Sequence, residues 1–497
     1  MYSHFHVSFF DGTKLWNYFS NYFFNPALKH KNLCTFAGKL HINNFSCIMA
    51  NVIKIKKGLD INLKGKASDV LLNTGKSDSY AIVPDYYNGI TPKVVAKVGE
   101  KVKAGSVLMI DKNRPEIKFV SPVSGEVTAV NRGEKRKVLS IVVKPDTQIE
   151  YEDFGKKNVS SLKSEEIKEA LLNGGMWPFI KQRPYDIVAT PTDEPRDIFV
   201  SAFYSAPLAP NFDFILKGQE TDFQTGLDAL AKLTKGKVYV GVRKGSSVNV
   251  KGVETVEFEG PHPAGNVGVQ INHIKPVNKQ EVVWVVNPAD VIVIGRLFNK
   301  GVADFSRLVA ITGSETTERG YIKTISGCTI NSLVAGKILE GKEDLRIISG
   351  NVLTGTKVRK DDYLGAYDNQ ITVIPEGDKT YDFFGWATPG FGKYSVSHSF
   401  FTWLAPKSKE YVIDARIKGG KRAMIMSNEY EKVFPMSIYP EYLLKAIIAF
   451  DIDKMENLGI YEVAPEDFAL CEFVDTSKIE IQKIVRQGLD LLYKEMN

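Results

Sequence analysis

Lys112 is a candidate for covalent chemistry. It stands in the stretch LMIDKNRPEIKFV (108–120), between two short apolar runs that predict the strands of a hairpin. A lysine amine at the exposed tip of such a hairpin can carry a cofactor in amide linkage. Asn113, Arg114 and Pro115 supply the turn-forming residues, so we expect them to form the tip and Lys112 to lie on its shoulder.

The segment around Lys112 resembles a biotinyl-lipoyl domain. The resemblance rests on residues that match that family's turn glycines, core leucine and closing Pro-x-x-Gly: Gly99, Gly105, Leu108, Pro122 and Gly125. The Asp111-Lys112 pair matches the lipoyl dipeptide, but it lies too close to Leu108 and follows Ile110, where those domains have glutamate. We therefore expect the fold of a carrier domain, used for docking, without a lipoyl or biotinyl group.

The other reactive side chains do not form a site in the sequence. Cys328 and Cys471 stand far apart with no CxxC partner, and an iron–sulfur cluster needs about four thiolates. His262, His273 and His398 occur in three separate segments without ligand spacing. We predict no metal and no catalytic residue in this chain.

Nucleotide-binding motifs are also absent from the sequence. It contains no G-x-G-x-x-G, and Gly75-Lys76-Ser77 imitates the end of a phosphate-binding loop but has Val70 where the first glycine belongs.

A net charge of +6 on 497 residues gives no reason to expect nucleic acid. No run approaches the roughly 20 apolar residues that cross a bilayer.

The first 48 residues differ from the rest. They are crowded with aromatic side chains and hold four of the seven histidines, yet they lack the pattern of a signal peptide. We expect an extension upstream of a true start at Met49; an aromatic anchor is the alternative. Without its four lysines and one aspartate, the net charge falls from +6 to +3.

The remaining chain predicts a multidomain α/β and α+β protein. Residues 49–147 alternate short β-branched runs with turns and predict an all-β domain of the barrel-sandwich hybrid type. Residues 154–308 predict a Rossmann-like α/β domain, and residues 309–378 a β-grasp (SLBB-like) domain. Residues 379–497 predict a mainly helical C-terminal domain.

Individual elements follow from the same patterns. Within the α/β domain, SEEIKEALLN predicts a helix and Gly174-Gly175 its end, whereas DVIVIG (290–295) predicts a strand. Near the C-terminus, PEYLLKAII predicts a helix, and Ser477 with Glu480 predicts a capping box that opens a helix over 478–495.

From Met49 onward the chain resembles the A subunits of the sodium-translocating NADH:quinone oxidoreductases (Na⁺-NQR). The resemblance runs through all four predicted domains in family order. Its clearest motifs are KIKKGLD (54–60), DKNRPEIKFVSPVSGEV (111–127), GPHPAG (260–265), RIISGNVLTG (346–355), EGDKTYDFFGW (376–386) and EDFALCEFV (466–474). Family members often have a second cysteine four residues after Cys471, where this chain has Asp475.

The resemblance implies a peripheral protein on the cytoplasmic face of the bacterial inner membrane. The whole complex would oxidise NADH, reduce a membrane quinone and export Na⁺. The flavins, the 2Fe–2S cluster and the NADH site would reside on partner subunits, with no cofactor in this chain. Its partners would be the other subunits, above all a membrane subunit, with quinone contact as an additional role.

The layout also resembles, more distantly, the flavin-binding subunit of respiratory complex I and the C subunits of the Rnf complexes. Those relatives have a glycine-rich loop against the flavin phosphate, where this chain reads Gly174-Gly175-Met176-Trp177-Pro178-Phe179. The bulk of Met, Trp and Phe argues against flavin there. Asp193-Glu194 is either a remnant of their nucleotide contact or a solvated turn.

Two segments are candidates for quinone contact. His262 lies in the stiff GPHPAG loop, and Phe384 and Trp386 form an aromatic cluster before a Pro-Gly turn. Loop stiffening and core packing are the competing interpretations. The alternative functions are an autonomous enzyme that depends on a flavin or a carrier lysine, and an Rnf-type electron-transfer subunit.

Overall fold

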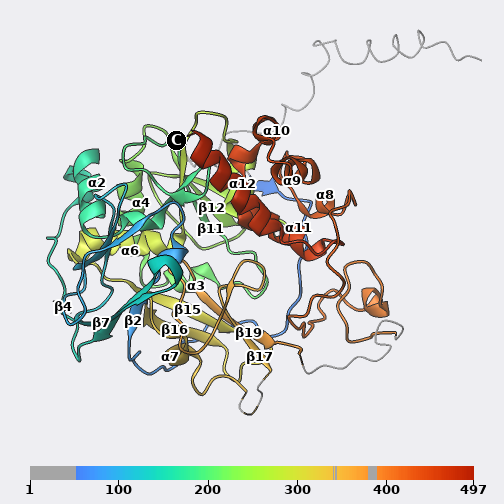
Figure 1. The fold of residues 1–497 in the computed structure, drawn as a ribbon, viewed down its shortest axis with the longest axis horizontal. Coiled ribbons are helices and arrows are strands. Elements are labelled where there is room, and N and C mark those ends of the chain that lie inside the picture. Colours follow the sequence, from blue (N-terminus) through green and yellow to red (C-terminus); the bar gives the residue numbers. More distant parts are fainter. Residues whose placement is uncertain (1–51, 340, 342–343, 379–388, 497) are drawn as a thin grey trace, which may run out of the picture. The chain divides into compact units, whose positions relative to one another are not determined.

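The computed structural model describes residues 52–339, 341, 344–378 and 389–496. The chain divides into two compact units, Met1–Met49 and Ala50–Asn497, and every element below belongs to the second. Figure 1 shows its sheets and the C-terminal group of helices. The predicted extension of 48 residues lies outside the described residues.

Two antiparallel sheets form the all-β domain. The four-stranded sheet has the order β2 (Tyr80–Ile82), β8 (Val138–Pro145), β7 (Gly125–Arg132) and β4 (Lys101–Val102). The three-stranded sheet has the order β3 (Pro92–Val94), β5 (Val107–Asp111) and β6 (Lys118–Val120). The first residue of β7, Gly125, requires glycine, because its φ is 155° and a Cβ there would collide with Lys144 O. These sheets agree with the predicted barrel-sandwich hybrid.

A seven-stranded sheet forms the α/β domain. Its order is β1 (Val52–Lys54), β13 (Glu254–Glu259), β12 (Val238–Arg243), β11 (Ile198–Ala202), β14 (Val283–Val286), β9 (Ile180–Arg183) and β10 (Ile187–Val188). The first five strands are parallel, and β9 runs antiparallel to both of its neighbours, β14 and β10. The mostly parallel sheet was predicted, because strand-like and helix-like segments alternate along the sequence.

The strand Val52–Lys54 differs from its predicted place. Its sequence predicted a strand of the all-β domain, but it pairs with β13, and Ile55 N continues the pairing by donating to Glu259 O at 2.8 Å. Ile55 is buried with residues of the α/β and C-terminal regions. Alternation predicts a strand but does not identify its partner.

Five helices belong to the α/β region. They are α2 (Ser164–Asn173), α3 (Phe212–Leu216), α4 (Glu220–Ala231), α5 (Val267–Ile274) and α6 (Pro288–Lys300). As predicted, α2 ends before Gly174. Helices α4 and α6 pack against each other (Figure 1), because glycines let their backbones approach: a Cβ on Gly226 would collide with Val291 O, and one on Gly295 with Asp222 O.

The predicted strand at residues 290–295 is wrong, because these residues lie inside α6. Asn287 caps the helix by accepting from Ala289 N, Pro288 opens it, and Gly301 ends it with a φ of 73°. Side chains are buried around the whole circumference of the helix. An unbroken apolar run fits a buried helix as well as a buried strand, so the caps were the deciding signal.

A five-stranded mixed sheet forms the predicted β-grasp domain. Its order is β16 (Gly320–Ile325), β15 (Ser306–Thr312), β19 (Gln370–Pro375), β17 (Leu345–Ser349) and β18 (Thr356–Val358). The pair β15–β19 is parallel and the other pairs are antiparallel. The short helix α7 (Ile330–Val334) lies between β16 and β17 in the sequence.

The C-terminal region is mainly helical, as predicted. It contains α8 (Tyr430–Val433), α9 (Pro440–Ile448), α10 (Ile452–Asn457), α11 (Ala469–Val474) and α12 (Ile481–Met496). The predicted capping box is wrong, since α12 begins at Ile481. Asp475 instead orders the loop before the helix, accepting from Ser477 N at 3.0 Å and Ile479 N at 2.8 Å, and Glu472 accepts from Gln482 N in the first turn of α12 at 2.8 Å.

Candidate functional site

The crevice where an open α/β sheet normally binds its ligand is filled by side chains. Strand order reverses between β11 and β14, and ligands of such sheets bind outside the carboxyl ends of the strands at this point. Here Tyr204 follows β11 and donates to Asn287 Oδ1, after β14, at 2.7 Å. Asn369 of the β-grasp domain donates to Tyr204 Oη at 3.2 Å. The β-grasp domain therefore closes the crevice.

A buried ion pair lies beside this closure. Arg307 of β15 donates to Asp290 Oδ1 at 2.9 Å, and both side chains are buried. Arg307 also donates to Ala366 O at 3.1 Å. Burial raises the pKa of Asp290 to about 6, although Arg307 and Lys181 act to lower it. The pair joins the first turn of α6 to the β-grasp domain.

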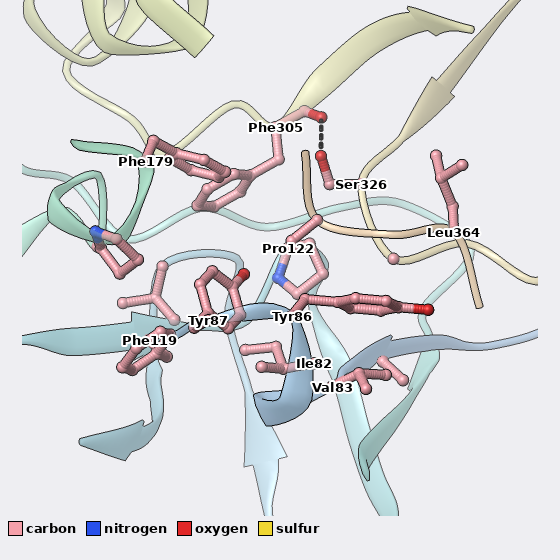
Figure 2. Close-up of a pocket in the computed structure, with 16 residues that line it drawn as sticks. Ile82, Val83, Tyr86, Tyr87, Phe119, Pro122, Phe179, Phe305, Ser326 and Leu364 are labelled. Carbon is pink, nitrogen blue, oxygen red and sulfur yellow. Dashed lines mark hydrogen bonds between the residues drawn. The ribbon is translucent and has the colours of Figure 1, made fainter. Parts of the chain in front are cut away.

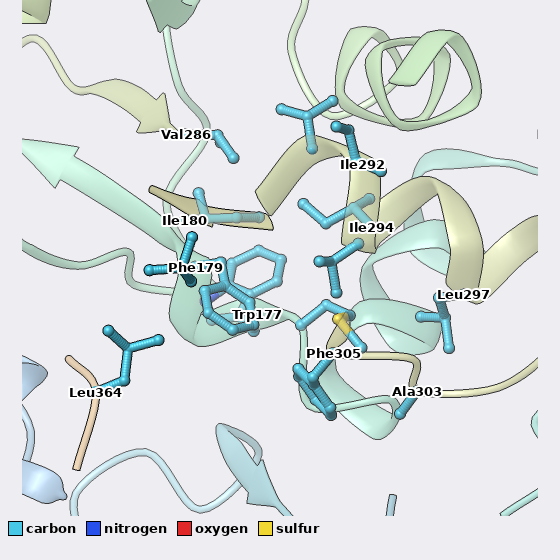
Figure 3. Packing of buried hydrophobic residues seen from close by; sticks show 14 of the residues in the cluster. Trp177, Phe179, Ile180, Val286, Ile292, Ile294, Leu297, Ala303, Phe305 and Leu364 are labelled. Atoms are coloured by element: carbon cyan, nitrogen blue, oxygen red, sulfur yellow. The ribbon is translucent and has the colours of Figure 1, made fainter. Parts of the chain in front are cut away.

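The loop after α2, residues 174–179, is part of the core. Trp177–Phe179 form a single 3-10 turn, and the side chains of Met176, Trp177 and Phe179 are buried. Trp177 Nε1 donates to Ala189 O at 2.8 Å, and its ring meets Trp284 edge to face at 5.3 Å. Figure 3 shows Trp177 and Phe179 packed among apolar side chains that include Ile294. These side chains fill the core on the inner side of the loop.

A cavity beside this loop is too small for a cofactor. It measures about 40 Å³, whereas pockets for small organic ligands measure roughly 300–1,000 Å³. Its walls come from the all-β, α/β and β-grasp domains, with Tyr87, Pro122, Phe179 and Phe305 turned toward one another (Figure 2). The volume suits a few water molecules at most.

The hairpin tip next to Lys112 is fixed to the α/β domain. Lys112 is exposed, and its backbone N donates to Thr91 O at 2.7 Å. Arg114 donates to the buried Asp111 carboxylate at 2.8 Å, to Val188 O at 3.1 Å and to Gly89 O at 2.8 Å. A carrier hairpin must present its lysine to distant sites, whereas this tip is held against β10.

His262 is buried and held by hydrogen bonds. Its Nδ1 lies 3.0 Å from Ser205 Oγ, and its backbone N donates to Asp60 Oδ1 at 2.9 Å. Gly265 N also donates to Ser205 Oγ at 2.8 Å, and Leu59 N to His262 O at 2.8 Å. The loop thus connects the end of β11 to the chain segment after β1. Burial lowers the pKa of His262 to about 4, so the imidazole is neutral near pH 7.

The buried neutral state of His262 predicts a pH dependence of stability. Between pH 6.5 and 4 the unfolded histidine binds a proton that the folded one does not, so stability is lost as pH falls through this range. We expect this group to contribute roughly 3 kcal/mol to that loss. Urea unfolding at pH 7 and pH 4.5 measures it. His262→Gln should show a smaller pH difference than the unsubstituted chain, and an equal difference would contradict the assignment.

The other predicted candidates do not come together. His273 Nδ1 lies 2.9 Å from Val269 O within α5, and His398 is exposed. Cys328 and Cys471 are both buried, and burial raises the pKa of the Cys328 thiol to about 11. Phe384 and Trp386 lie outside the described residues. Among the residues that the structure describes, no three His, Cys, Asp or Glu side chains could hold a metal ion.

The acidic pair considered as a remnant nucleotide contact lies at the surface. Glu194 is exposed and pairs with exposed Lys235 at 2.6 Å. Asp193 N donates to Thr190 O at 3.0 Å, as in a turn.

In the described part of the chain, no helix is both long and apolar enough to cross a bilayer.

A second buried arginine was not predicted from the sequence. Arg183 of β9 donates to Asp467 Oδ2 at 2.8 Å, to Glu462 O at 2.7 Å and to Glu466 Oε1 at 3.1 Å. The Glu466 side chain is 43% exposed, and partial desolvation together with the neighbouring Asp467 raises its pKa. The first two residues of the EDFALCEFV motif therefore hold the C-terminal region to the α/β sheet. The sequence signal that could have indicated this contact was the adjacent acidic pair Glu466-Asp467.

Three models of known protein domains match this chain. They are the NqrA N-terminal barrel-sandwich hybrid domain over residues 53–146, the NqrA second alpha/beta domain over 162–303, and the NQRA C-terminal domain over 308–360. A curated protein of Neisseria meningitidis is 37% identical over 450 residues, which are 89% of this chain and 100% of the relative. The chain belongs to the NqrA family.

Three relatives of this NqrA-family chain carry the same name. Those of Neisseria meningitidis, Yersinia pestis and Hahella chejuensis are each named as the A subunit of a Na(+)-translocating NADH-quinone reductase, and the latter two are 36% identical over 89% of this chain and 100% of the relative. A solved NAD⁺-reducing [NiFe]-hydrogenase chain aligns over 68% of this chain and 62% of its own length, at 12% identity and a TM-score of 0.36. The family assignment confirms the predicted resemblance and fold class.

Proposed function

We propose that this chain is the NqrA component of a Na⁺-translocating NADH:quinone reductase and that it acts by docking and assembly, without a redox centre of its own. Full-length similarity to the named relatives supports the first part. The closed crevice supports the absence of a redox centre, because Tyr204, Asn287 and Asn369 occupy the place where an α/β sheet would bind a nucleotide.

The remaining chemistry is assigned to partner subunits. In this proposal they hold the flavins, the 2Fe–2S cluster and the NADH site, and one that spans the membrane anchors this chain on the cytoplasmic face of the bacterial inner membrane. The fixed hairpin tip at Arg114 supports a docking role for the all-β domain in place of a carrier role. Sodium crosses the bilayer through the membrane subunits.

Quinone contact is a narrower proposal. His262 is proposed as a structural residue, because its side chain is buried and bonded to Ser205. The candidate contacts in this chain are therefore Phe384 and Trp386, whose rings could flank a quinone ring.

Co-purification tests the proposed function. The full chain, tagged at its C-terminus and expressed with the other subunits, should bring them through two purification steps. Its omission should abolish quinone-dependent NADH oxidation while oxidation with an artificial acceptor continues on the partner subunits. Purification of the chain alone, with NADH oxidation of its own, would contradict the proposal and favour an autonomous enzyme.

Lys112→Ala should leave both the modification state and the turnover of the complex unchanged. The lysine side chain is exposed, so its loss should change the free energy of unfolding by no more than about 0.5 kcal/mol. Intact mass and quinone reduction are the measurements. A lipoyl or biotinyl adduct that disappears with this substitution would overturn the docking role.

The matched comparison is Arg114→Ala, two residues away. It leaves the Asp111 carboxylate buried without its arginine and removes the hydrogen bonds to Val188 O and Gly89 O. We expect a loss of about 1–3 kcal/mol of stability. Equal stability of the two variants would show that the tip is not held against the α/β domain.

A further inference from the structure

An apolar surface stands out in the segment that precedes the C-terminal helices. We call residues 389–409 the aromatic loop. Within it, Phe391, Phe401, Trp403 and Leu404 are 68%, 53%, 54% and 68% exposed. Phe401–Leu404 form one 3-10 turn in which only Thr402 is buried, so three of its four side chains face outward.

The aromatic loop is held by the body of the protein. Thr402 Oγ1 donates to Lys393 O at 2.7 Å, and the buried Tyr411 donates from its hydroxyl to Thr402 O at 3.4 Å. Tyr394 packs edge to face on Tyr411 at 5.4 Å and also contacts Phe473 of α11 at 6.2 Å. The inward aromatic side chains thus anchor the loop, while the outward rings pack on other residues of the loop itself, Phe401 on Phe391 at 6.4 Å and Trp403 on His398 at 5.8 Å.

The charge of the surface is strongly biased. The aromatic loop contains Lys393, Lys407 and Lys409 and no aspartate or glutamate. Residues 389–426 hold seven basic and two acidic side chains, a net +5, whereas the whole chain of 497 residues carries +6. One acidic side chain, Asp414, is already paired with Arg416 and Lys418. The segment therefore presents a net positive charge to an anionic partner, with Lys407 and Lys409 next to the exposed apolar side chains.

The composition decides between a lipid and a protein partner. Protein interfaces favour aromatic residues and arginine but are depleted in lysine. Trp and Phe together with lysine are typical of segments that lie at the membrane–water interface, where rings enter the headgroup region and ammonium groups meet lipid phosphates. All three basic residues of the aromatic loop are lysines.

We propose that the aromatic loop binds the surface of an anionic phospholipid membrane. Phe401, Trp403 and Leu404 enter the boundary between headgroups and acyl chains, and Lys407 meets the lipid phosphates. The inference rests on the proposed function only for its setting beside a membrane. It gives this chain a lipid contact of its own, in addition to its attachment through a membrane subunit.

Vesicle flotation of the full chain tests the proposal. Vesicles of phosphatidylcholine alone are compared with vesicles that also contain phosphatidylglycerol. Binding should require the anionic lipid and weaken when salt shortens the range of electrostatic attraction. Leu404→Ser and Trp403→Ser should each lower the partition coefficient roughly tenfold, the scale of removing one inserted apolar side chain. Lys407→Glu should lower it roughly tenfold on the anionic vesicles, since each basic group near such a surface contributes.

Leu71→Ser is the matched control, because Leu71 and Leu404 are 65% and 68% exposed. It should leave the partition coefficient unchanged. Equal loss with Leu71→Ser, equal binding to neutral vesicles, or no vesicle binding at all would overturn the proposal. If the Trp403→Ser chain no longer co-purifies with the membrane subunit, in the absence of vesicles, the surface is a protein interface and the lipid proposal is overturned. Co-purification is scored separately, so failure of the lipid contact is distinguishable from failure of the proposed function.

Discussion

Arg307→Met should lower the free energy of unfolding by about 3–5 kcal/mol, because it leaves the Asp290 carboxylate buried without its partner. The loss should be larger at pH 8 than at pH 5. Burial already raises the pKa of Asp290 to about 6, and removing the arginine raises it further, so acid neutralises the stranded group. Urea unfolding at the two pH values gives both results.

The double variant Arg307→Met with Asp290→Leu is the control for this prediction. It removes both charges and fills the site with apolar side chains, so much of the lost stability should return. A double variant as unstable as the single one would show that the damage comes from packing. In that case the pair would not be what joins α6 to the β-grasp domain.

Trp177→Ala should also cost about 3–5 kcal/mol, since it empties a fully buried site and removes the hydrogen bond to Ala189 O. Trp403→Ala is the matched control; that ring is 54% exposed, so its loss should stay within about 0.5 kcal/mol. Urea unfolding followed by circular dichroism measures both variants. Small, equal losses of stability in the two variants would contradict the role of Trp177 in the core.

The same Trp177 variant addresses the flavin question from the other side. If the bulky ring merely blocked a site that is otherwise intact, Trp177→Ala would begin to bind flavin mononucleotide. The buried neighbours Met176 and Phe179 remain in the variant, so we expect no binding in an equilibrium titration. Saturable binding would show that a phosphate site persists beneath the tryptophan.

Local patterns predicted the elements better than their partners. The apolar face of Ile167, Ala170 and Leu171 correctly placed α2, because a helix face depends on neighbours three and four residues apart. Residues 290–295 were misread because a run buried on all sides has no face. The strand Val52–Lys54 was recognised as a strand, but its pairing with β13 depends on residues about 200 positions away.

The candidate site shows the same limit. The bulk of Met176, Trp177 and Phe179 was visible in the sequence, and all three side chains are buried. The residues that close the crevice were not identified, because Tyr204 and Asn369 lie in different domains and carry no motif. Buried arginine pairs such as Arg183 with Asp467 also join distant segments, so no local spacing announces them.

The absence of a redox centre in this chain is the central claim, and the absorption spectrum and intact mass of the purified full chain test it most directly. We expect protein absorption alone and a native mass equal to that of the polypeptide. A flavin or iron–sulfur absorption band that survives gel filtration, or a native mass increased by a bound cofactor, would contradict the claim.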